Sequence, residues 1–124
     1  MTIALYIAAI LLVLVGVAHS YLGERYILIR LFRREDLPKT FGSTEFTTRT
    51  LRFAWHITSI AWWGFAAILI HLAHGTISHQ VVARVIGITF LATGCATLVG
   101  SRAKHLAWPV FIIIGIISMC AGAA

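Results

Sequence analysis

The sequence has few charged residues. Asp, Glu, Lys and Arg make up 11% of the 124 residues, whereas soluble domains carry roughly 25%. A soluble domain of this size has a large surface to cover and cannot spare so many polar side chains. With 60% hydrophobic residues and a mean hydropathy of +0.92, the composition excludes an ordinary soluble domain and indicates a protein of the lipid bilayer.

Cysteine is also scarce, with only Cys95 and Cys120 in the chain. In the spans predicted below, their depths in the membrane differ by roughly 15 Å, at ~1.5 Å per helical residue. A disulfide needs Cα atoms within about 7 Å of each other. We therefore expect no disulfide, and both cysteines to be small packing residues.

Long apolar runs are plentiful. A helix needs about 20 apolar residues to cross the hydrocarbon core. Four segments qualify: 2–22, 53–73, 80–100 and 106–123. The first lacks the basic start of a signal peptide and is taken as a retained span. Small residues recur at helical spacing in these spans. The sequence thus predicts an all-α integral membrane protein, with residues 1–124 forming one compact four-helix transmembrane bundle.

Positive charge is distributed unevenly along the chain, whose net charge is +6. The long loop 23–52 and the short loop 101–105 carry all the basic residues except Arg84. Because positive residues stay in the cytoplasm, both loops are predicted to be cytoplasmic and both termini to lie outside, in a bacterial inner membrane. Anionic lipid headgroups explain this charge better than nucleic acid, for which no motif is present.

The long basic loop contains local signals of its own. Residues 25–36 mix aliphatic side chains with arginines, so they continue the first helix or lie along the membrane interface. Pro38 stops that segment, because the residue before proline avoids the helical conformation. Ser43 or Thr44 is a candidate N-cap for the next helix, with Glu45 in its first turn.

Three histidines from three predicted spans fall within about one helical turn of the cytoplasmic boundary: His19, His56 and His105. Ionisable residues inside the membrane are candidates for function, and imidazole is the commonest metal ligand. Together with Glu24 or Glu45, the three imidazoles predict a site for zinc, copper or iron.

Two alternatives to a metal site remain open. His19 and His56 are also suited to bind haem b axially, with Arg25, Arg49 or Arg52 near the propionates. In the second alternative, the histidines only bond to neighbouring helices or reach the interface. A separate group near the opposite membrane face, His71, His74 and His79, is a weaker metal candidate because histidine is common at interfaces.

The remaining polar residues narrow the function classes. Ser59 lies three residues after His56, but no nucleophile motif surrounds it, so the chain is not expected to be an enzyme and no catalytic residue is assigned. No Asp, Glu, Lys or Arg lies centrally in any span, which disfavours a transporter. Three classes stay open: a metal or haem module, an accessory protein that binds lipid or a membrane-protein partner, and a small transporter that forms a homo-oligomer.

Overall fold

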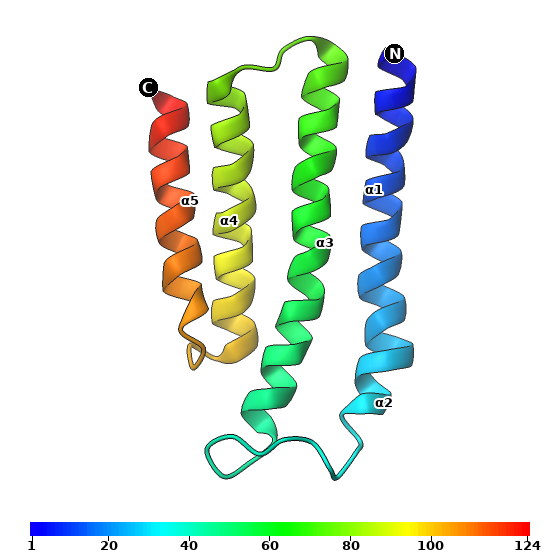
Figure 1. Cartoon of the computed structure of the whole chain (residues 1–124), viewed down its shortest axis with the longest axis vertical. Helices are drawn as coiled ribbons and strands as arrows, with labels where there is room; N and C mark the ends of the chain where they lie inside the picture. The colour runs from blue at the N-terminus through cyan, green and yellow to red at the C-terminus, as the bar shows by residue number, and fades with distance from the viewer.

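The computed structural model describes all residues, 1–124, and its regular structure is entirely helical (Figure 1). The first rod consists of α1 (Thr2–Leu22), the π-helix η1 (Gly23–Leu28) and α2 (Ile29–Leu31). Three further helices follow: α3 (Glu45–His74), α4 (His79–Ser101) and α5 (Ala107–Ala123). The prediction of an all-helical chain with four long helical segments is confirmed.

Three of the four rods are long and apolar enough to cross a membrane: Thr2–Leu31, α3 and α4. The fourth, α5, is apolar but has only 17 residues. At ~1.5 Å per residue it reaches about 25 Å, slightly less than the ~30 Å hydrocarbon core. The first rod and α3 have 30 residues each, about 45 Å by the same rise.

The helices on either side of the long loop extend past the predicted spans, and the predicted continuation of the first helix into residues 25–36 and the predicted helix start at Ser43–Glu45 are confirmed. The first rod ends at Leu31 and α3 begins at Glu45, so the predicted loop 23–52 shrinks to residues 32–44. An ion pair of 2.7 Å between Glu45 and Arg49, four residues apart, stabilises the first turn of α3. Ser43 Oγ accepts a hydrogen bond from the Glu45 amide. Both rods therefore project past the turn between α4 and α5 (Figure 1).

The four rods lie side by side in one open layer, in the order α1, α3, α4, α5 (Figure 1). Each rod packs only against its neighbours in the sequence, and α1 contacts neither α4 nor α5. Only 14 of the 124 residues are buried as a result. The predicted compact bundle is therefore wrong: the small-residue stripes exist, but they join sequence neighbours and do not close a ring.

Glycines set the close approach of these helices, as the sequence predicted. Gly16 lies against the indole of Trp63 where α1 meets α3. Where α4 meets α5, Gly94 lies against Ile112 and Gly115 against Leu91. A side chain at any of these three positions would collide with the facing helix, so glycine is required for this spacing.

The two ends of the layer differ in charge. Both termini and the α3–α4 connection lie at one end, here called the terminal end (Figure 1). Loop 32–44 and the turn at 102–106 lie at the other, here called the basic end (Figure 1). Every Lys and Arg except Arg84 lies in or next to the basic end. Cys95 and Cys120 are both free, but both are exposed, so the expectation that they are packing residues is wrong.

Candidate functional site at the basic end

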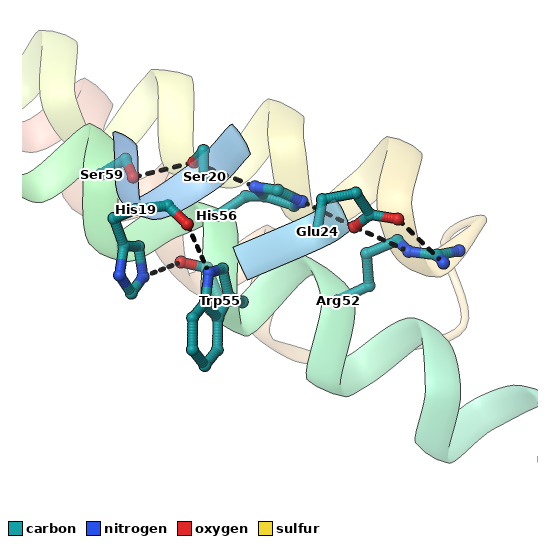
Figure 2. Close-up of polar contacts among 7 residues, drawn as sticks. All are labelled: His19, Ser20, Glu24, Arg52, Trp55, His56 and Ser59. Atoms are coloured by element: carbon teal, nitrogen blue, oxygen red, sulfur yellow. Dashed lines mark hydrogen bonds and ion pairs between the residues drawn. The ribbon is translucent and has the colours of Figure 1, made fainter. Parts of the chain in front are cut away.

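A chain of polar contacts joins α1 to α3 on the way to the basic end (Figure 2). The buried Ser59 hydroxyl donates to the Gly16 carbonyl oxygen at 2.8 Å. Ser20 Oγ lies 2.8 Å from Ser59 Oγ, and His56 Nδ1 lies 3.0 Å from Ser20 Oγ. Polar groups inside the layer are thus paired between helices.

The chain of contacts continues to two charged residues (Figure 2). His56 Nε2 lies 3.2 Å from Glu24 Oε2. Arg52 donates from Nε to the same oxygen at 3.2 Å and from Nη2 to Oε1 at 3.1 Å. Glu24, on the π-helix η1, therefore links His56 and Arg52 of α3. The Arg52 guanidinium also lies over the Phe32 ring, 4.9 Å from its centroid.

Counting protons constrains this network. Each serine hydroxyl has one hydrogen to donate. Because Ser59 donates to Gly16, the single Ser20 hydrogen is directed either to Ser59 Oγ or to His56 Nδ1. In both arrangements the His56 ring links the serine pair to the Glu24 carboxyl group.

His19 does not join His56. Its ring stacks on Trp55 with centroids 4.5 Å apart and planes 2° apart, and its Nε2 lies 3.3 Å from the Trp55 carbonyl oxygen. Trp55 in turn donates from Nε1 to the His19 carbonyl oxygen at 3.0 Å. Figure 2 shows His19 directed toward Trp55 and away from His56. The two rings do not face a common haem iron.

The other predicted ligands are also engaged elsewhere. His105 stacks near Phe46, and its Nδ1 accepts from the Ala107 amide at 3.2 Å, at the start of α5. Glu45 pairs with Arg49, and Arg25 donates to the Tyr21 hydroxyl at 3.2 Å. No group of three or more His, Cys, Asp or Glu in the chain is arranged to hold a metal ion.

The histidines at the terminal end are separate from one another as well. His74 Nε2 lies 3.1 Å from the Tyr6 hydroxyl, whereas His71 Nδ1 contacts Thr76 Oγ1 at 3.0 Å. Arg84, the one basic residue of this region, donates from Nε to the Gly122 carbonyl oxygen at 2.8 Å. It thereby caps the C-terminal end of α5, where a positive charge is favourable.

A cavity of about 880 Å³ lies between α3 and α4 at the basic end. We call it the arginine cavity, because three arginines line it against a single glutamate, Glu45. Six of its eleven lining residues come from α3 and four from α4, with Arg102 just beyond the end of α4. The lining residues are Glu45, Thr48, Arg49, Arg52, Phe53, His56, Cys95, Ala96, Val99, Gly100 and Arg102.

Sequence reasoning missed this cavity. Arg49, Arg52 and His56 are spaced by three and four residues, so they share one face of a helix. That spacing was visible and a helix start was predicted at Ser43–Glu45, but the arginines were treated as loop residues because the membrane span was expected to begin at residue 53. Arg102 joins them because it ends α4 in the left-handed conformation, with φ of 51°.

The arginine cavity is chemically suited to anions. A guanidinium offers a planar fork of donors that matches carboxylate and phosphate oxygens. Arg49, whose side chain is only 19% exposed, is held by Glu45, which also lies 3.9 Å from Arg102. The cavity therefore combines a positive excess with the apolar side chains of Phe53 and Val99.

No protein-family model, curated protein or solved structure matches this chain. Its function is therefore inferred from the arginine cavity and the polar network beside it.

Proposed function

We propose that this chain is an integral membrane protein of the accessory class, which binds an anionic headgroup in the arginine cavity at the cytoplasmic face of a bacterial inner membrane. The observation that carries the proposal is the convergence of Arg49, Arg52 and Arg102 on one cavity. The lengths of the rods and the distribution of charge support this placement.

The basic end is suited to the headgroup region of a bilayer. The first rod and α3 have 30 residues each, about 45 Å, which exceeds the ~30 Å hydrocarbon core. Their excess length carries the arginines beyond the hydrocarbon. Positive residues favour the cytoplasmic side, so both termini then lie outside. Arg84, the one arginine away from the basic end, does not argue against this orientation, because it caps the C-terminal end of α5.

The charges around the cavity leave room for an added anion. Glu45 is shared by Arg49 and Arg102, and Glu24 is shared by Arg52 and His56. Three guanidinium groups thus face two carboxylates. A phosphate entering the cavity gains charge-assisted hydrogen bonds from arginines that are already oriented by these pairs.

The test is lipid binding by the purified protein in phosphatidylcholine nanodiscs to which phosphatidylglycerol is added stepwise. Retained lipid is measured by native mass spectrometry. The double variant Arg49→Gln/Arg102→Gln is expected to weaken phosphatidylglycerol binding by about tenfold, ~1.4 kcal/mol, because two of the three cavity donors are lost.

The matched control is Arg30→Gln/Arg33→Gln. It removes the same charge from exposed positions at the basic end that do not line the cavity. General attraction to an anionic surface depends on the number of charges near it, so the control reports that contribution alone. Equal losses in the two double variants would refute a specific headgroup site.

A further inference from the structure

An apolar hollow of about 250 Å³ lies between α3 and α4, nearer the terminal end than the arginine cavity. Its α3 wall includes Ile60, Trp63 and Ala67, and its α4 wall includes Ile88 and Ala92. No charged residue lines it. We call this hollow the apolar track.

The arginine cavity and the apolar track lie on the same side of the α3–α4 pair. On α3, the residues Arg52, His56, Ile60, Trp63 and Ala67 are spaced by three and four. Such spacing places side chains along one helix face. The two hollows therefore follow one another along one surface.

The α4 wall shows the same continuity. Ile88 and Ala92 line the apolar track, and Cys95 and Val99 line the arginine cavity. Their spacing of four, three and four again describes a single helix face. A ligand on this surface meets arginines at one end and hydrocarbon side chains at the other.

We infer that the anionic ligand is a membrane lipid of the cytoplasmic leaflet, with its phosphate in the arginine cavity and one acyl chain in the apolar track. This inference rests on the proposed function. At ~1.5 Å per residue, the track begins about 12 Å from Arg52, at Ile60, and ends about 22 Å from it, at Ala67. It therefore includes the depth of about 15 Å at which one leaflet of the ~30 Å hydrocarbon core ends.

The opposite side of the α3–α4 pair provides a natural comparison. A larger groove there, of about 500 Å³, is lined by Ile57, Ala61 and Phe65 of α3 together with Ile86 and Phe90 of α4. None of its lining residues is charged. None of the three arginines of the arginine cavity lines this groove, so acyl chains in it should not distinguish anionic from zwitterionic lipid.

The experiment uses lipids that carry a photoactivatable diazirine in the acyl chain, one with a phosphatidylglycerol headgroup and one with phosphatidylcholine. Each is added to the full-length protein in phosphatidylcholine nanodiscs, and labelled residues are mapped by tandem mass spectrometry. The anionic probe is expected to label Ile60, Ala67, Ile88 and Ala92 several-fold more than the choline probe. Labelling around Ala61 should be equal for both.

Two variants separate binding of the lipid acyl chain from binding of its headgroup. Ala92→Phe fills the exposed track and is expected to abolish the anionic preference in labelling there, while native mass spectrometry still shows phosphatidylglycerol retained through the arginines. Ala61→Phe adds the same bulk to the opposite groove and should leave labelling of the track unchanged.

The outcomes distinguish the two proposals. Equal labelling of both sides by both probes, with binding still lost in Arg49→Gln/Arg102→Gln, overturns the acyl-chain site and leaves the headgroup site standing. Labelling of the track that is insensitive to headgroup charge, together with phosphatidylglycerol binding that is unchanged in Arg49→Gln/Arg102→Gln, overturns both proposals.

Discussion

The interface between α1 and α3 (the α1–α3 seam) and the interface between α4 and α5 (the α4–α5 seam) both bring two helices into close contact, but with different chemistry. Both rely on glycines, but in the α1–α3 seam the facing residues are tryptophans whose indole N–H groups donate to backbone carbonyls. Trp55 donates to His19 O at 3.0 Å and Trp63 to Val13 O at 3.3 Å. In the α4–α5 seam aliphatic side chains face the glycines, and Arg84 provides the one side-chain hydrogen bond between the two helices.

The two interfaces show two ways of specifying a helix pair, which matters in the proposed membrane setting because lipid removes the hydrophobic drive for association there. The α4–α5 seam depends on shape, because its glycines admit the backbone of the facing helix. The α1–α3 seam depends on pairing of polar groups, from Gly16 through Ser59, Ser20 and His56 to Glu24. Added side-chain volume should therefore destabilise the α4–α5 seam most, and loss of a polar partner should destabilise the α1–α3 seam most.

The largest effect is expected from Gly115→Leu in the α4–α5 seam. A Cβ at this position would lie 2.9 Å from the Leu91 backbone nitrogen, so the two helices must separate. Overpacking of this kind costs about 1–3 kcal/mol or more. Thermal unfolding in detergent measures the loss. Cys120→Leu, at an exposed position on the same helix, is the control, and an equal loss there would contradict the shape argument.

An intermediate effect is expected from the His56–Glu24 contact. A double-mutant cycle of His56→Leu and Glu24→Gln should give a coupling free energy of about 0.5–1 kcal/mol, reduced by partial solvent exposure of both groups. Chemical denaturation in mixed micelles supplies the four stabilities. The parallel cycle of His105→Leu with Glu24→Gln should be additive because these residues make no contact. Additivity in both cycles would show that His56 and Glu24 do not interact, which would contradict the proposed contact.

A smaller effect is expected from Ser59→Ala. The substitution removes the hydroxyl that bonds to Gly16 and contacts Ser20, and single polar contacts between membrane helices average about 0.6 kcal/mol. The same denaturation measurement detects it. Thr58→Ala is the control, since Thr58 bonds only to Ala54 of its own helix. A larger loss for Thr58→Ala would refute the interhelical role of Ser59.

The smallest effect is expected outside both seams, at the exposed pair Arg34–Asp36. The hydrogen bond from Arg34 lowers the pKa of the Asp36 carboxyl. Whatever stability the pair contributes is therefore present near neutral pH and lost as the pH falls through that lowered pKa. Asp36→Asn should leave the unfolding temperature unchanged at neutral pH. Carbon-13 NMR titration should show the Asp36 midpoint rising in Arg34→Gln, and an unchanged midpoint would contradict the pairing.

Much of the architecture was predictable from hydrophobic runs and glycine spacing. These gave four helical segments, the seam residues Gly16, Gly94 and Gly115, and the separation of basic and terminal ends. Hydropathy did not place the helix ends near Arg25 and Arg49, because it reports the solvent around a residue and says little about whether its backbone is helical. The capping signal at Ser43–Glu45 did predict the start of α3. Periodicity also identifies which face of a helix packs, but not which helix it meets, so the open layer was missed.

The candidate site was predicted in part. His56 and Glu24 were expected to lie close together, and they do. His19 and His105 were expected at similar depths, but their rings stack instead on Trp55 and Phe46. Depth follows from counting residues along a helix, whereas the rotation of each helix about its axis depends on packing that a single sequence does not reveal.

The open layer has a consequence for how the chain assembles. Since each rod touches only its neighbours in the sequence, the tertiary free energy is a sum of three independent interfaces, as in a linear repeat array. Each new helix can reach all its partners among those already inserted, without waiting for the C-terminus. Insertion can therefore follow the order of synthesis, and a defect in the last interface detaches α5 alone while the first hairpin stays intact.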